Sequence, residues 1–284
     1  MARRLFAILP VIAALLVGRA AAQDRDQQWD RCRLYDERGK PRPGTSPDVA
    51  IGACTTIIQA GKETAPNLAI VLMARGVAYR YKGQHERAIQ DFDQALRLDP
   101  NFAAAYNNRG LAEDDKGLYE RAIQDYDQAL RLDPGYAVAF YNRGNAYGSK
   151  GQYDRAIQDY DQALRLRPED PAGWNGRCWA RALANRLPEA LADCNQALRL
   201  RAGDANALDS RGLVYLKMRS PDLALADYDA ALKSDPKRAH WLYGRSLARR
   251  MKGDRVGADA DLAGALRGDP GIAAKYATYG VPGS

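Results

Sequence analysis

The feature that most constrains this chain is a repeat with a period of 34 residues. The segment QDFDQALRLDP at 90–100 recurs with few changes at 124–134 and again at 158–168. A repeat of this length is one supersecondary unit that cannot bury its apolar face alone. The repeat therefore predicts an array of stacked units in place of a single closed core.

Each unit has the pattern of two short helices. In the third repeat, the apolar residues Ala156, Tyr160 and Ala163 recur at helical spacing. We expect helices over about 139–149 and 153–166, joined by a turn at Gly151 because glycine permits the required backbone conformation. Asp-Pro steps such as 133–134 should end the second helix, since proline disfavours helix in the preceding residue.

The spacing of small and aromatic residues resembles the tetratricopeptide repeat family. The unit that starts at residue 137 carries the family pattern at Phe140, Gly144, Tyr147, Ala156, Tyr160, Ala163 and Pro168. Six such units follow one another in register. The resemblance implies an all-α, right-handed solenoid of antiparallel helix pairs with capping helices. We divide the chain into a signal peptide (1–22), a degenerate N-terminal helical hairpin that caps the array (23–66), six repeats (67–270), and a C-terminal capping helix and tail (271–284).

The first 22 residues have the layout of a secretory signal peptide. Arg3 and Arg4 precede an apolar run at 5–18, and small residues follow at 20–22. We expect cleavage between Ala22 and Gln23 and a periplasmic or secreted mature protein. The alternative interpretation is a buried N-terminal helix. The apolar run is too short to span a bilayer, and no later stretch approaches the necessary length, so we expect no integral membrane segment in the mature chain.

Composition argues against nucleic-acid binding. Loss of the three arginines in 1–22 would lower the formal net charge from +7 to +4. The remaining basic residues are interleaved with acidic ones and form no continuous basic surface.

Four cysteines, Cys32, Cys54, Cys178 and Cys194, fit an exported protein with disulfide bonds. Cys178 and Cys194 lie on the two helices of one repeat, equally far from the turn, so they should lie at the same height. Cys32 and Cys54 are related in the same way about the loop near residue 43. We predict these two pairings; the alternative is two pairs of buried free thiols. Zinc is not expected, because no CxxC is present and only two histidines exist.

No catalytic or cofactor-binding constellation is visible. The two histidines are far apart, and no glycine-rich phosphate loop is present. The repeated QDFD-type carboxylates recur from unit to unit, which we interpret as a solvated helix face and not an active site. We therefore expect a protein that is not an enzyme and has no cofactor and no metal, while an enzyme with an unrecognised site stays the least favoured alternative.

The family resemblance places partner binding in an inner groove lined by the first helix of each repeat. The expected partner-binding residues are Asn107, Asn108, Tyr141, Asn142, Asn145, Asn175, Trp179 and Tyr243. The same mapping adds Leu111, Asp114, Asp115, Ser149, Leu183, Asp209, Leu213, Lys217, Leu247 and Arg250. Asparagine offers donors and an acceptor to a peptide backbone, and aromatic residues dominate many interfaces.

We therefore expect a scaffold that binds a protein or an extended peptide in its concave groove. A carboxylate clamp of the kind found in some family members is not expected, because Met73 and Val77 stand where Lys and Asn are needed. The alternative is a non-catalytic recruitment subunit of an envelope complex, for example in cell-wall or outer-membrane assembly. Nothing in the sequence identifies the partner.

Overall fold

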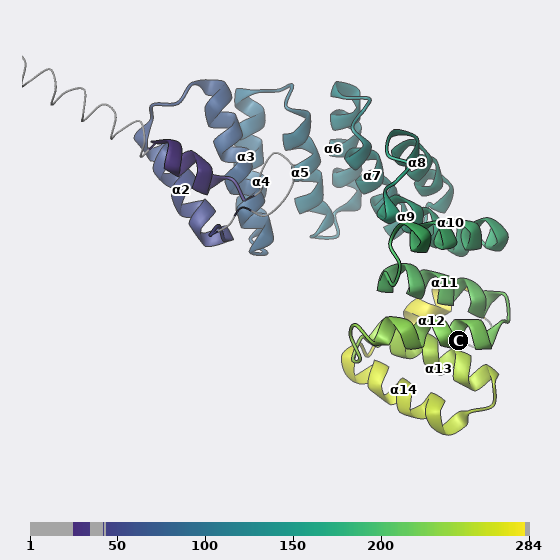
Figure 1. The fold of residues 1–284 in the computed structure, drawn as a ribbon. Coiled ribbons are helices and arrows are strands. Elements are labelled where there is room, and N and C mark those ends of the chain that lie inside the picture. Colours follow the sequence, from purple (N-terminus) through teal and green to yellow (C-terminus); the bar gives the residue numbers. More distant parts are fainter. Residues whose placement is uncertain (1–24, 35–41, 43, 282–284) are drawn as a thin grey trace, which may run out of the picture. The chain divides into compact units, whose positions relative to one another are not determined.

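The computed structural model describes residues 25–34, 42 and 44–281 (Figure 1). These residues fall into two compact units divided after Pro134. Throughout these ranges the chain forms helices and turns, with no strand. The predicted signal peptide, with its cleavage site at Ala22 and Gln23, lies outside the described residues.

The first unit begins with a helical segment at 25–32 and continues with helices that pack in consecutive pairs. These are α2 (Pro47–Ala60), α3 (Ala65–Tyr81), α4 (His85–Leu98), α5 (Ala103–Asp114) and α6 (Tyr119–Leu132).

The second unit repeats the same arrangement and ends in a short helix. Its helices are α7 (Ala137–Ser149), α8 (Tyr153–Leu166), α9 (Pro171–Leu183), α10 (Leu187–Leu200), α11 (Ala205–Lys217), α12 (Pro221–Leu232), α13 (Ala239–Met251), α14 (Arg255–Gly268) and α15 (Ile272–Thr278). The predicted helix at 153–166 is confirmed as α8, and α7 starts two residues earlier than the pattern indicated. We call the first helix of each repeat, from α3 to α13, its A helix and the second its B helix.

In four of the six repeats, a glycine on the A helix packs against an aromatic ring on the B helix. The ring of Tyr126 on α6 fills the space beside Gly110 on α5. A Cβ atom at Gly110 would lie 2.8 Å from Cε1 of Tyr126 and 3.1 Å from the carbonyl oxygen of Ala122. The second neighbour is backbone and cannot rotate away, so the pair approaches this closely only because residue 110 has no side chain.

Each pair is also joined by a buried ion pair, which corrects our interpretation of the repeated carboxylates. Asp125 is only 6% exposed, and its two oxygens accept hydrogen bonds from Arg109 at 2.7 and 2.8 Å. The bidentate hydrogen bond to Asp125 raises the pKa of Arg109. The same link recurs in Arg75–Asp91, Arg143–Asp159, Arg177–Asp193, Arg211–Asp227 and Arg245–Asp261. The solvated-face interpretation is therefore wrong for the first Asp of each QDxD segment.

The same arginines reach back to the preceding B helix. Arg109 donates to Asp93 at 2.6 Å within the first unit, and Arg177 donates to Asp161 at 2.6 Å within the second. Arg211 makes the equivalent bond to Asn195, and Arg245 to Asp229. One side chain thus joins three helices, so it fixes both the pair and the stacking of successive repeats.

The N-terminal segment takes the place of a B helix beneath the first repeat. Ala50, Cys54 and Ile57 are buried on α2, and Arg75 on α3 donates a hydrogen bond to Thr55 at 3.2 Å. A disulfide joins Cys54 to Cys32 in the preceding helical segment. The short helical segment at 25–32 is thereby held covalently against α2.

The second predicted disulfide lies inside the fourth repeat. Cys178 on α9 and Cys194 on α10 are fully buried and bonded to each other, with their Cα atoms 5.3 Å apart. They occupy the positions of Gly144 and Tyr160 in the preceding repeat. A covalent bond here replaces the packing of a ring against a glycine.

Candidate functional site

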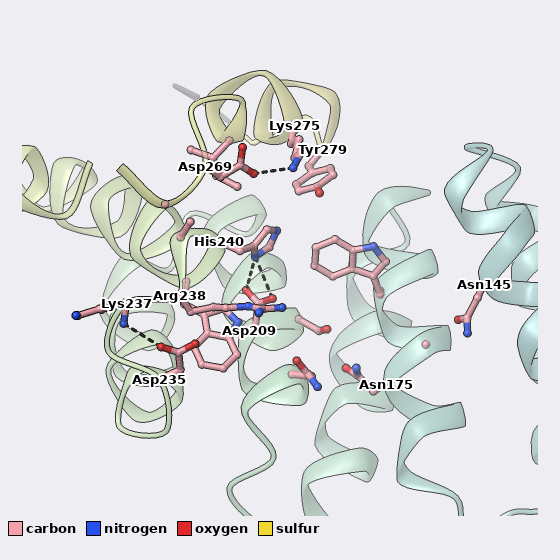
Figure 2. Close-up of a pocket in the computed structure, with 18 of the residues that line it drawn as sticks. Asn145, Asn175, Asp209, Asp235, Lys237, Arg238, His240, Asp269, Lys275 and Tyr279 are labelled. Carbon is pink, nitrogen blue, oxygen red and sulfur yellow. Dashed lines mark hydrogen bonds and ion pairs between the residues drawn. The ribbon is translucent and has the colours of Figure 1, made fainter. Parts of the chain in front are cut away.

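The A helices of the second unit surround a hollow with a volume of about 770 Å³. Helices α7, α9, α11 and α13 all contribute residues, and α15 forms one wall (Figure 2). The lining combines aromatic rings, three asparagines and ionisable groups. It includes Tyr141, Asn145, Asn175, Trp179, Asn206, Asp209, Lys237, Arg238, His240, Asp269, Lys275 and Tyr279.

A cluster of aromatic rings lies where the C-terminal segment meets the A helices. The rings of Trp179 on α9 and Tyr279 lie 5.3 Å apart in an edge-to-face arrangement. His240 on α13 lies 5.6 Å from Trp179 and 4.8 Å from Tyr276. Such ring geometries contribute about 0.5–1.5 kcal/mol each beyond burial of their area. These contacts leave the Trp179 side chain only partly exposed.

Lys217 near the end of α11 holds the backbone of the C-terminal segment. Its Nζ donates to the carbonyl oxygens of Ala182 at 2.7 Å and Tyr279 at 2.9 Å. Burial lowers the pKa of this ammonium group. The carbonyl of Tyr279 is thus recognised in the way that a bound peptide carbonyl would be.

The amide side chains provide both satisfied and unsatisfied hydrogen-bonding groups. Oδ1 of Asn145 accepts a hydrogen bond from the hydroxyl of Tyr160 at 2.7 Å. Oδ1 of Asn175 is buried and has no partner among the described residues. A buried acceptor without a donor costs about 1–3 kcal/mol. A ligand that donates an N–H group to Asn175 would recover that cost.

The charged groups of the hollow are partly paired. His240 lies 3.1 Å from Asp209, and Lys275 of α15 forms an ion pair with Asp269 at 2.6 Å (Figure 2). Lys237 and Arg238 are exposed at the start of α13. Among the described residues, no group of His, Cys, Asp and Glu side chains could hold a metal ion.

The structure brings together four of the eight residues predicted to bind a partner. Tyr141, Asn145, Asn175 and Trp179 all line the hollow. Asn142 and Tyr243 lie on the same A helices but are buried, with 7% and 5% of their surface exposed.

The other two predicted residues belong to the first unit. Asn107 is buried, and Asn108 donates its amide N–H to the carbonyl oxygen of Ala104 in its own helix at 2.8 Å. This hydrogen bond ties the Asn108 side chain to its own helix and leaves it less available to a ligand.

Two important residues of the site were missed from the sequence. These are His240 and Tyr279, neither of which is among the partner-binding residues expected from the sequence, and Tyr279 falls in the predicted C-terminal cap at 271–284. A usable signal was present: Ile272, Tyr276 and Tyr279 follow the i, i+4, i+7 spacing of an amphipathic helix, which requires an apolar surface to cover it.

The arrangement defines an all-α repeat solenoid of helix pairs. Models of the tetratricopeptide repeat match residues 73–137, 137–170 and 210–271, which together span more than half of the chain. The chain belongs to the tetratricopeptide repeat family, whose fold typically serves as a non-catalytic scaffold for protein interactions.

Solved structures give the same result. YrrB, a tetratricopeptide protein with an unusual peptide-binding site, is 26% identical and has a TM-score of 0.54, with 69% of this chain and 99% of YrrB covered. A tetratricopeptide protein from Parabacteroides merdae is 18% identical, with a TM-score of 0.68 over 90% of this chain and 99% of that one. PilF from Pseudomonas aeruginosa is 20% identical, with a TM-score of 0.63 over 76% and 99%. No curated protein sequence matches the chain.

Proposed function

We propose that this protein is an interaction scaffold that holds a segment of a partner protein in the hollow lined by α7, α9, α11 and α13. The observation that carries the proposal is Asn175, which lines the hollow and whose buried Oδ1 has no donor among the described residues. A partner backbone N–H supplies that donor. Tyr141 and the exposed part of Trp179, which also line the hollow, supply apolar contact.

Similarity to YrrB supports this proposal, because YrrB is a repeat protein of the same kind with a peptide-binding site of its own. The lining also fits a polypeptide better than a small metabolite, since amide groups and aromatic rings are distributed over four successive A helices. Asn145, Asn175 and Asn206 offer hydrogen bonds to a backbone without requiring one particular sequence.

A second proposal concerns where the protein acts. Two buried disulfides form only in an oxidising compartment in most organisms. No described helix has the length and apolar character of a membrane span. These observations support an exported protein, and a recruitment subunit of an envelope complex is the corresponding alternative function. The two functions differ only in the partner.

A photo-crosslinking amino acid at Asn206 tests the site, because Asn206 lines the hollow and its side chain is exposed. In cells of the source organism we expect a specific crosslinked protein from this position. The control position is Gln158, which is exposed on a B helix of the same unit. Asn175→Leu should lower the crosslink yield from position 206 about fivefold, the equivalent of one hydrogen bond. Crosslinking from Gln158 alone would place the partner elsewhere.

A further inference from the structure

Part of the predicted groove is already occupied by the chain itself. The sequence pattern assigned Trp179, Lys217 and Tyr243 to the inner faces of three successive A helices. In the structure, Trp179 contacts Tyr279, Lys217 binds the Tyr279 carbonyl oxygen, and Tyr243 packs on Tyr276 with ring centroids 4.7 Å apart. The C-terminal segment therefore uses the contacts expected of a bound partner.

The segment is attached through one face only. Ile272, Tyr276 and Val281 are buried, and the hydroxyl of Tyr276 donates to the carbonyl oxygen of His240 at 3.0 Å. The side chains at 273–275, 277 and 278 are exposed. This one-sided burial is the mode in which an amphipathic helix binds to a groove.

Residues 272–281 also depend on the groove for their structure. Helix α15 has seven residues, far fewer than the roughly 12–15 that an isolated helix needs to be even marginally stable. Its packing is mainly against α13. Folding of this segment is thus coupled to docking.

We propose that the inner face of α9, α11 and α13 is a docking site for a short amphipathic helix with apolar or aromatic residues at i, i+4 and i+7, and that residues 272–281 occupy it in cis and compete with partner segments of the same pattern. This inference rests on the proposed function, since it adds a competitor and a preferred ligand shape to the same inner face. A tethered segment has an effective concentration in the millimolar range, so it excludes all but tight or abundant competitors.

The test uses a labelled synthetic peptide of residues 270–284 as the probe, added to the full-length protein. Wild-type protein should bind it at least about tenfold more weakly than a variant whose own segment cannot dock. That variant carries Ile272→Asp and Tyr276→Ala, which remove two buried anchors. Adding Lys217→Gln to it should weaken binding of the probe again, because the Tyr279 carbonyl loses its donor.

The matched control carries Ala273→Asp and Thr278→Ala on the exposed side of α15. It should behave like the wild type. Equal affinity of the wild type and the undocked variant for the probe would overturn the inference.

A second measurement covers the case in which the undocked variant does not fold. Hydrogen exchange of the wild-type chain should show the amides of α15 opening at a lower free energy than those of α11. Exchange of both helices only through global unfolding would show that the segment is a fixed part of the fold and would overturn the inference. Neither measurement uses the natural partner. Failure of this inference can therefore be distinguished from failure of the proposed function, which crosslinking at Asn206 tests.

Discussion

At the scale of single residues, the first unit contains a buried carboxylate that its fold does not satisfy. Glu113 on α5 is 8% exposed, and its Oε2 has no hydrogen-bond partner among the described residues. Burial, followed by the negative charge of Asp125, raises the pKa of Glu113 to about 7. By contrast, the neighbouring Asp125 is buried with Arg109 and is fully paired.

The raised pKa gives a signed prediction for Glu113→Gln. Protonated Glu113 is favoured in the folded state, so its stabilising contribution is present below the unfolded-state pKa of 4.5 and is lost as pH rises through about 7. We expect the variant to gain stability over the wild type between pH 5 and pH 8, by up to about 3 kcal/mol. Urea unfolding at several pH values measures this difference.

The control for that experiment is Glu189→Gln, which makes the same substitution at an exposed position on α10. It should show no comparable trend. A constant difference between Glu113→Gln and wild type across this pH range would contradict the burial argument.

At the scale of elements, the fourth repeat joins its A helix to its B helix differently from the neighbouring repeats. Four of the other five repeats use a glycine and a ring, as in Gly144 with Tyr160, where a Cβ atom would lie 3.0 Å from the ring. The sixth repeat has Ser246 and Leu262 at these positions. The fourth repeat uses the disulfide between Cys178 and Cys194. The Arg177–Asp193 ion pair is retained, so only the packing position has changed.

Replacement of both cysteines separates the covalent from the packing contribution. Cys178→Ala with Cys194→Ala should lower the free energy of unfolding by about 3 kcal/mol, the value of the chain-entropy model for a loop of this length. Cys178→Gly with Cys194→Tyr should recover part of the loss, because it restores the pair of the neighbouring repeats. Thermal melts of the three proteins decide the matter, and identical melting temperatures would show that the bridge adds no stability.

At the scale of the whole molecule, export and disulfide formation belong together. The two buried disulfides fit the export that we propose, because disulfides persist mainly in oxidising compartments, and residues 1–22 have the layout predicted for a signal peptide. The described part of the chain contains no membrane-spanning helix.

Mass spectrometry of the exported protein should therefore find a mature chain that starts at Gln23, with Cys32–Cys54 and Cys178–Cys194 linked in peptides from non-reduced digests. Replacing Leu15 and Leu16 with Asp should retain the protein inside the cell with reduced cysteines, because the apolar run is interrupted. Export with Met1 intact would refute cleavage.

The sequence by itself determined the helix pairs, their register and the cysteine pairing. These follow from local rules: a 34-residue period, helical spacing of Ala156, Tyr160 and Ala163, and glycine and proline at the turns. In a repeat array most contacts join residues of the same or the next repeat, so the sequence pattern of one repeat predicts the structure of the next. The packing of the Tyr126 ring against Gly110 is a contact of this local kind.

Only the tertiary structure decided which side chains are paired or covered and which remain exposed. Asp125 looks like a surface carboxylate until Arg109 is placed beside it, 16 residues away along the chain. Trp179 is partly covered by Tyr279, and Lys217 binds a carbonyl 62 residues further on. The Arg109–Asp125 pair recurs in every repeat, whereas the two contacts of the C-terminal segment join residues that share no period, so no repeat pattern encodes them. They exist because a short apolar helix at the end of the chain must cover its buried face, and the inner surface of the A helices is where it does so.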